Sequence, residues 1–241
     1  MEVMSKIFSY IMIKIAFQIL DKHGTKYQSS GTPKLGCADG LFTLKKSLSM
    51  RKNHDEETFA GFADLVKDYD TEDHKLLIKV SEQYGAPTKF CSDIERMYTD
   101  LVVILKIGKS IAEISQEIGV RQGDNMAPVL FLFLMSDFAE SLDAIWEENG
   151  LEKDELKQPS KEDFENGKGI IKSHKPSQYK SSKLKTTKVI QCIYVDDGVF
   201  LFKTRQQLIT GMKLVQQHMD RFGLEIHIVR EVNGKTKPSK T

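Results

Sequence analysis

Apolar residues recur with helical spacing in several parts of the chain and predict most of its helices. From Ile7 to Ile19 isoleucine occupies every fourth position, which marks one face of a core helix over residues 7–20. With Lys14 in its middle, this segment is too short and too charged to cross a membrane. The other predicted helices cover residues 41–52, 76–84, 93–105, 128–146 and 205–222.

Three short apolar runs have the length of strands rather than helices. The run from residue 58 to 63 stops abruptly at Asp64. Two further runs, over residues 189–195 and 199–202, are joined through Asp196-Asp197-Gly198, and an Asp-Gly pair between such runs is a strong signal for a β-hairpin. The pattern therefore predicts one carboxylate at the end of a strand and two more at the tip of a hairpin.

The charge changes sign between the helix over 128–146 and the hairpin. Residues 151–166 hold three lysines against six acidic residues, whereas residues 167–190 hold seven lysines and no acidic residue. This polarity indicates a charged insertion at about residues 147–188. Its basic half is interpreted either as a solvated surface loop or as a nucleic-acid contact.

The composition is that of a globular protein of one or two domains. Of 241 residues, 40% are hydrophobic and 29% are charged, which excludes a disordered, collagenous or membrane-embedded chain. The net charge of +1 gives no global attraction to nucleic acid, so such a partner would need a local basic surface. Three cysteines without a C-x-x-C pair fit a reducing compartment, and the absence of a signal peptide or transmembrane segment predicts an intracellular protein.

Asp196 and Asp197 offer the hard oxygen ligands that Mg²⁺ prefers when substrate phosphates complete its coordination. An Asp-Gly turn by itself is more often only a turn. Asp64 strengthens the metal hypothesis, because acidic residues on adjacent strands could hold two metal ions about 4 Å apart for an in-line phosphoryl displacement. The hypothesis requires the strand before Asp64 and the hairpin to be neighbours.

Three motifs resemble the reverse transcriptases of non-LTR (LINE-type) retrotransposons. Tyr194-Val195-Asp196-Asp197 is similar to the signature tetrapeptide of the family, and Gly119-Val120-Arg121-Gln122-Gly123-Asp124 followed by Pro128 is similar to a loop of the non-LTR subclass. Residues 62–71 resemble the first palm motif, in which Asp64 takes the place of the leading aspartate. The motifs occur in the order of the family, and the resemblance covers nearly the whole chain.

The resemblance implies a catalytic site and its cofactors. Asp64, Asp196 and Asp197 would be the catalytic residues and would bind two Mg²⁺ ions, for which Mn²⁺ could substitute. Tyr69 would lie under the incoming sugar as a gate that favours deoxynucleotides.

The resemblance also implies contacts with the nucleic acid. Arg121, Gln122 and Gly123 would lie against the nascent base pair, where glycine permits close approach of the backbone. Lys34 would be the remaining basic residue of a fingers segment in which relatives carry further arginines.

Some positions depart from the family pattern. Asp68 stands where the family has a small residue, and its charge would repel the triphosphate unless Lys67 or a metal ion offsets it. The residue that protonates pyrophosphate could be Arg230, Lys235 or Lys240.

The implied fold is α+β, a polymerase palm in which helices back an antiparallel sheet, together with a partial fingers region. Residues 1–54 would be the partial fingers, and residues 55–241 the palm with the charged insertion inside it. The resemblance places the start of the chain inside the fingers and its end before the thumb.

The implied function is RNA-directed DNA polymerisation by a retroelement domain, a nucleotidyltransferase that adds dNTPs to a DNA primer on an RNA template, with no membrane involved. The alternative is a catalytically inactive remnant that at most binds nucleic acid through basic residues at 45–52 and 168–188. An RNA-synthesising palm enzyme is a weaker rival, because Tyr69 and the Arg121-to-Asp124 loop disfavour it.

Overall fold

The computed structural model describes residues 3–31, 35–53, 55–66, 73–116, 118–120, 125–151, 155–159, 184–188, 191–227, 230–232 and 235–237. The helices are α1 (Val3–His23), α2 (Cys37–Asn53), α3 (His74–Gln83), α4 (Thr88–Tyr98), α5 (Ala127–Glu148) and α7 (Arg205–Arg221). The strands are β1 (Phe59–Ala63), β2 (Leu65–Val66), β3 (Val102–Ile107), β4 (Ser110–Ser115), β5 (Glu155–Pro159), β6 (Leu184–Lys188), β7 (Gln191–Tyr194), β8 (Asp197–Phe202), β9 (Glu225–Ile226), β10 (Arg230–Val232) and β11 (Lys235–Lys237). Over these ranges, none of the helices has the length and hydropathy needed to cross a membrane.

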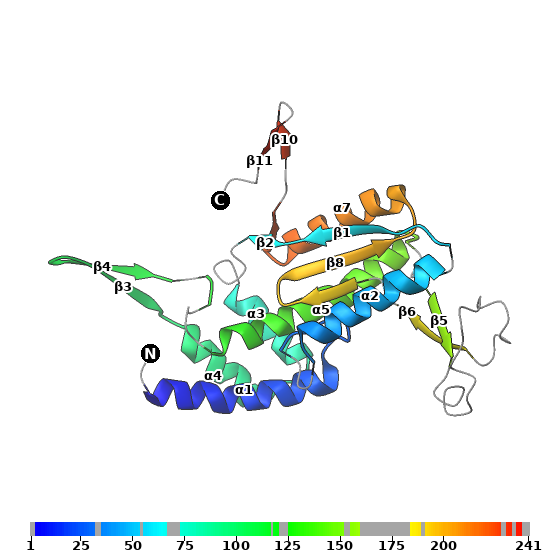
Figure 1. Cartoon of the computed structure of the whole chain (residues 1–241). Coiled ribbons are helices and arrows are strands. Elements are labelled where there is room, and N and C mark those ends of the chain that lie inside the picture. The colour runs from blue at the N-terminus through cyan, green and yellow to red at the C-terminus, as the bar shows by residue number, and fades with distance from the viewer. Residues whose placement is uncertain are drawn as a thin grey trace.

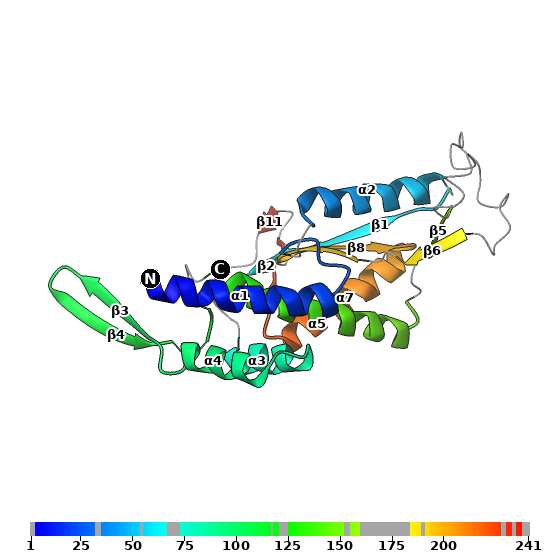
Figure 2. The ribbon, with the colours of Figure 1, turned by 90° about the horizontal axis from the view of Figure 1, so that it is seen from below.

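A three-stranded antiparallel sheet in the order β1-β8-β7 forms the centre of the molecule. β8 pairs with β1 on one side and with β7 on the other. Helices α5 and α7 lie against one face of this sheet, and α2 lies on the opposite side (Figures 1 and 2). The predicted α+β fold, an antiparallel sheet backed by helices, is therefore confirmed.

Helix α5 is the central element of the hydrophobic core. Every residue from Val129 to Met135 is at most 5% exposed, as expected for a segment that is apolar on all sides. At the other end of α5, Trp146 packs edge-on against Phe200 and Phe202 of β8, with ring centroids 5.7 and 5.9 Å apart. These aromatic contacts fix the sheet on the helix.

Helix α7 approaches the sheet closely because glycine occupies the contact positions. A Cβ atom at Gly61 of β1 would lie 2.3 Å from the sulfur of Met212, and one at Gly211 of α7 would lie 2.2 Å from the ring of Phe202. At Gly211 the obstacle is the buried ring of Phe202, whereas at Gly61 it is the flexible side chain of Met212. The spacing between α7 and the sheet therefore depends mainly on Gly211.

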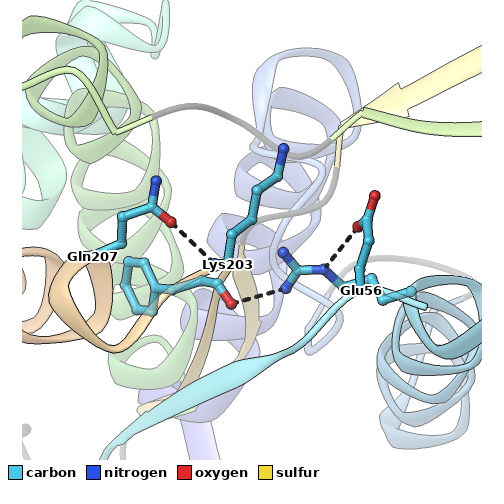
Figure 3. A network of polar contacts seen from close by, with 5 residues as sticks. Glu56, Lys203 and Gln207 are labelled. Atoms are coloured by element: carbon cyan, nitrogen blue, oxygen red, sulfur yellow. Dashed lines mark hydrogen bonds and ion pairs between the residues drawn. The ribbon is translucent and has the colours of Figure 1, made fainter. Parts of the chain in front are cut away.

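A polar network joins the ends of α2, β8 and the start of α7 (Figure 3). The buried Arg51 donates from Nη1 to the carbonyl of Phe202 at 3.2 Å, and its Nε lies 3.9 Å from Glu56. Beside it, the amide of Lys203 donates to Gln207 Oε1 at 3.1 Å. Because Arg51 is only 1% exposed, it cannot belong to the basic surface predicted for residues 45–52.

The predicted core helix near the start is confirmed as α1, but the predicted face is wrong in its first half. Ile7 and Ile11 are 51% and 52% exposed, whereas Met12, Ala16 and Leu20 are buried. α1 packs on α5, and Met12, Ala16 and Leu20 belong to the hydrophobic core. The buried face of α1 therefore includes these residues rather than Ile7 and Ile11.

The predicted helix over 93–105 is also wrong in its second half. α4 ends at Tyr98, and Val102–Ile107 forms β3, which pairs with β4 across Gly108 and Lys109. The β-branched run that opens β3 favours a strand, and Gly108 adopts the left-handed conformation that the turn requires, with φ of 61°. Every residue of this hairpin is exposed, and it projects away from the rest of the molecule (Figure 1).

Strands β5 and β6 pair at the two ends of the predicted charged insertion. Glu155 is opposite Lys188, and Pro159 is opposite Leu184. The chain therefore enters and leaves this segment at one place, while residues 160–183 lie outside the described ranges.

Candidate functional site

Three carboxylates from distant parts of the sequence meet at one end of the central sheet. One carboxylate oxygen from each of Asp64, Asp196 and Asp197 lies within 4.8 Å of the other two. The strands that carry them, β1 and the β7–β8 hairpin, are neighbours, as the metal hypothesis required. Oxygen ligands at this spacing are suited to hard divalent cations.

Asp64 reaches the site because β1 alternates between a buried and an open face. Gly61 and Ala63 are buried towards the helices, whereas Phe62 and Asp64 are exposed. Ala63 pairs with Gly198, so that the next residue, Asp64, lies beside Asp197. Strand alternation and register together bring these two carboxylates to one face of the sheet.

The backbone at Asp64 is held from a second direction. After Asp64 the chain leaves the central sheet and forms β2, which pairs with β9. The amide of His227, just beyond β9, donates to the carbonyl of Asp64 at 2.8 Å. Asp64 therefore lies at the junction of two sheets, with its main chain fixed on both sides.

The predicted turn Asp196-Asp197-Gly198 is wrong in its register. Tyr194 pairs with Asp197, so the two turn residues are Val195 and Asp196, and Asp197 begins β8. Gly198 is a buried strand residue, where an added Cβ would lie 3.1 Å from the Phe200 ring. Gly198 is therefore required by close packing rather than by the turn. The residue in the left-handed conformation is Val195, with φ of 58°.

Gln28 was not predicted as a residue of this site. Its side chain bonds to the backbone of Val195, 167 residues along the chain, whereas the family resemblance implies only that Gln28 belongs to the partial fingers region over residues 1–54. A lone glutamine in a loop carries no local sign of such a distant partner. Only the folded arrangement shows the contact.

The carboxylates influence one another electrostatically. Desolvation, followed by the negative charges of Asp196 and Asp64, raises the pKa of Asp197 above its ordinary value. Repulsion of this kind is relieved either by a proton or by a cation. The site therefore has the electrostatic character of a cation-binding cluster.

Two aromatic side chains are exposed beside the carboxylates. Phe62 is 72% exposed and Tyr194 is 40% exposed, in strands β1 and β7 respectively. Phe62 lies two residues before Asp64, and Tyr194 is paired with Asp197. The open end of the sheet thus offers apolar rings next to acidic groups.

The remaining predicted site residues lie outside the described ranges. These are Lys34, Tyr69, Arg121, Gln122 and Gly123. Residues that precede positions 121–124 are described: the Gly119 carbonyl lies 2.6 Å from His74 Nε2 and accepts from Gln116 Nε2 at 3.2 Å. After these positions, Met126 is fully buried.

The three candidates for a general acid are not distinguished. Arg230 and Lys235 lie in the paired strands β10 and β11, but their side chains are not described. Lys240 lies outside the described ranges.

Comparison with known proteins identifies a matching family. The model of the family "Reverse transcriptase (RNA-dependent DNA polymerase)" matches residues 1–229. A curated relative, the retrovirus-related Pol polyprotein from type-2 retrotransposable element R2DM of Drosophila melanogaster, is 28% identical over 111 residues, which are 46% of this chain and 10% of the relative. The predicted resemblance to reverse transcriptases of non-LTR retrotransposons is confirmed by these matches.

Solved telomerase structures share the fold. Apo telomerase from Candida tropicalis, truncated from its C-terminal domain, matches with a TM-score of 0.57 and 12% identity over 96% of this chain and 40% of that chain. Telomerase from Candida albicans, in complex with a TWJ fragment of telomeric RNA, matches with a TM-score of 0.59 and 11% identity over 99% of this chain and 34% of that chain. The present chain thus spans less than half of each of these proteins.

Proposed function

Because the chain belongs to the reverse transcriptase family, we propose that it is the RNA-directed DNA polymerase domain of a retroelement. The observation that carries this proposal is the meeting of three carboxylates within 4.8 Å at one end of the sheet. Phosphoryl transfer depends mainly on electrostatic stabilisation and positioning, which such a cluster provides once it holds cations.

The residues at the site fit divalent cations, and we propose that they bind two. Asp64, Asp196 and Asp197 supply only oxygen ligands, and their mutual repulsion favours a bound positive charge. When bound, two Mg²⁺ ions, or Mn²⁺ in their place, would lower the pKa of the primer 3′-hydroxyl and neutralise the charge of the leaving pyrophosphate.

The chain itself positions the reacting groups. The backbone of Asp64 is fixed by β1 and by His227, and Asp197 is fixed by its pairing with Tyr194. The exposed rings of Phe62 and Tyr194 offer apolar surface on which the sugar and base of a primer end can rest. A primer end seated there would place its 3′-hydroxyl next to the carboxylates.

The substrates follow from the proposed activity. We assign dNTPs, an RNA template and a DNA primer as partners, with Tyr69 as the sugar gate and Arg121, Gln122 and Gly123 beside the nascent base pair. Lys34 is assigned to a phosphate contact. Residues 1–54 are assigned to partial fingers and residues 55–241 to the palm.

Primer extension on an RNA template tests this function. The wild-type protein should extend a DNA primer with dNTPs in Mg²⁺ or Mn²⁺, and Asp196→Asn should reduce the rate by several orders of magnitude. Asp220→Asn, which removes an exposed carboxylate from α7, is the matched control and should retain the wild-type rate. Lack of incorporation with either metal would favour the inactive remnant, and preference for NTPs would favour an RNA-synthesising enzyme.

A binding measurement tests the nucleic-acid contact separately from catalysis. Lys45 and Lys46 are exposed on α2, and each lysine that neutralises a phosphate releases counterions. The variant with both lysines changed to glutamine should bind a primer–template more weakly, with the salt dependence of log K reduced by about 1 to 2. An unchanged slope in filter binding or anisotropy would exclude α2 from the contact.

A further inference from the structure

One buried glutamine holds the turn that contains Asp196 and leads directly into Asp197. Gln28 is 2% exposed, and its Oε1 accepts from the amide of Val195 at 3.0 Å. Its Nε2 donates to the carbonyl of the same residue at 3.2 Å. A single side-chain amide therefore satisfies both backbone polar groups of Val195.

Val195 adopts a conformation that its own side chain disfavours. Its φ of 58° is in the left-handed region, which is a genuine outlier for a β-branched residue. Such a conformation persists only when the surrounding structure holds it. The two hydrogen bonds from Gln28 are a specific means of holding it.

The conformation of Val195 determines where the carboxylates lie. The turn between β7 and β8 consists only of Val195 and Asp196, and Asp197 follows at once. A change in φ at Val195 therefore rotates the backbone from which both acidic side chains project. The position of Asp196 depends directly on this backbone angle, whereas Asp197 is also held by its pairing with Tyr194.

Gln28 is itself held in place by the strand next to it. The amide of Ser29 donates to the carbonyl of Ile193, and the amide of Ile193 donates to the carbonyl of Tyr27, both at 2.9 Å. Gln28 Oε1 also accepts from the amide of Ser30 at 3.1 Å. The glutamine is thus a rigid support rather than a mobile side chain.

We propose that Gln28 is a positioning residue of the acidic site, acting through Val195 to set the geometry in which Asp196 and Asp197 bind divalent cations. This proposal rests on the proposed function for the role of the cations. Outer residues that orient metal ligands often affect metal affinity strongly although they do not contact the ion.

A double-mutant cycle with Mn²⁺ as the probe tests the proposal. Gln28→Met removes both hydrogen bonds to Val195, together with the one from Ser30, at similar volume. It should weaken Mn²⁺ binding, measured by electron paramagnetic resonance, about tenfold or more. Glycine adopts a positive φ without steric cost, so Gln28→Met should have a much smaller effect when Val195 is changed to glycine. Equal effects in both backgrounds would overturn the proposal.

A matched control separates positioning from general loss of stability. Gln191 is a second buried glutamine, 1% exposed, whose Nε2 donates to the carbonyl of Ala139 in α5. Gln191→Met should lower the melting temperature but leave Mn²⁺ affinity unchanged, whereas Gln28→Met should lower the affinity at temperatures where the protein is folded. If both variants lose affinity in proportion to their loss of stability, the proposal is wrong.

Hydrogen exchange at the Val195 amide measures the contact between Gln28 and Val195 in the absence of metal. The amide should be protected in the wild type and in Gln191→Met, and unprotected in Gln28→Met. Equal exchange in all three would overturn the proposal. If instead Mn²⁺ binds equally well to wild type and to Asp196→Asn, the metal site of the proposed function fails, and the exchange data still decide whether Gln28 holds the turn.

Discussion

The ionised carboxylate of Asp197 lowers the stability of the metal-free fold. Its carboxylate lies with those of Asp64 and Asp196 within 4.8 Å, and its pKa is raised, so the ionised cluster costs free energy in the absence of cations. Because the folded pKa is above the unfolded one, this cost is present at neutral pH. It disappears as the pH falls through the folded pKa and the group takes up a proton.

We therefore expect Asp197→Asn to stabilise the metal-free protein. At pH 7 the free energy of unfolding in urea should rise by about 0.5 kcal/mol, the scale of interactions between exposed charges. The gain should vanish at acidic pH, and Mg²⁺ should raise the melting temperature of the wild type more than that of the variant. A loss of stability at pH 7 would contradict the electrostatic account.

His218 is a second titratable residue whose environment favours one protonation state. It is buried between α7 and α5, stacks on Phe138 and bonds through Nε2 to Ser141 at 2.7 Å. Burial first, and then the positive charge of Arg221, lower the pKa of His218 to about 4. The folded state therefore keeps this imidazole neutral at physiological pH.

This environment predicts a loss of stability on mild acidification. In the unfolded chain His218 takes up a proton below its ordinary pKa of 6.5, whereas in the folded chain it does so only near pH 4. From pH 7 to pH 5 the free energy of unfolding should fall by about 2 kcal/mol through this residue. Chemical denaturation of His218→Gln should show a smaller fall, whereas His23→Gln, at the exposed end of α1, serves as the control. An undiminished fall in His218→Gln would show that another group is responsible.

At the scale of elements, α7 packs so closely on the sheet that replacing a helical glycine by alanine should destabilise the fold, the opposite of the usual effect. Alanine is favoured over glycine by about 1 kcal/mol inside a helix. At Gly211, however, its Cβ would lie 2.2 Å from the buried ring of Phe202. Overpacking of this kind typically costs about 1 to 3 kcal/mol.

We therefore expect Gly211→Ala to destabilise the fold by about 1 kcal/mol or more despite the better helix former. Thr210→Ala, one position earlier on α7, only removes atoms and so cannot overpack; it should be neutral or slightly stabilising. Thermal unfolding of the two variants measures the difference. A higher melting temperature for Gly211→Ala would mean that α7 can move away from β8.

The elements that the sequence predicted well are those with a local cause. The apolar run before Asp64, the buried helix α5 and the strands β7 and β8 follow from patterns that neighbouring residues carry themselves. Convergence of the three carboxylates could be anticipated because two acidic motifs end strands and occur in a known order. Their catalytic role stays a prediction.

The elements that were missed depend on distant contacts or on competing local signals. The face of α1 is decided by its contact with α5, and the register of the β7–β8 turn by the packing of Gly198 against Phe200. The contact between Gln28 and Val195 joins residues 167 positions apart, which no local pattern reveals. For the β3–β4 hairpin, the helix predicted over 93–105 conflicts with the β-branched run at Val102, which favours a strand.

At the scale of the whole molecule, the first 54 residues are tied directly to the central sheet. Tyr27 and Ser29 bond to β7 through the backbone, and Arg51 bonds to the end of β8. The regions proposed as fingers and palm therefore share hydrogen bonds rather than only a linker. Movement of one against the other would have to break or bend these contacts.

The projecting β3–β4 hairpin is the largest departure from a compact shape (Figures 1 and 2). Val103, Ile107 and Ile114 are 47–69% exposed and share one face of the hairpin, and contiguous exposed apolar surface promotes association. Changing these three to threonine keeps the β-branched shape and should leave the melting temperature within about 1 °C, since none is buried. Light scattering at high concentration should decrease. A large drop in melting temperature would show that the hairpin supports the core.

The β5–β6 pairing marks a position where the chain should tolerate insertions, because Glu155 lies opposite Lys188 and Pro159 opposite Leu184. Sequence between two strands that already lie side by side can lengthen or shorten at little entropic cost, because closing a longer loop adds only a logarithmic penalty. A fluorescent protein or an affinity tag could be inserted between β5 and β6 without separating the three carboxylates of Asp64, Asp196 and Asp197. Insertions during evolution should be tolerated at the same position.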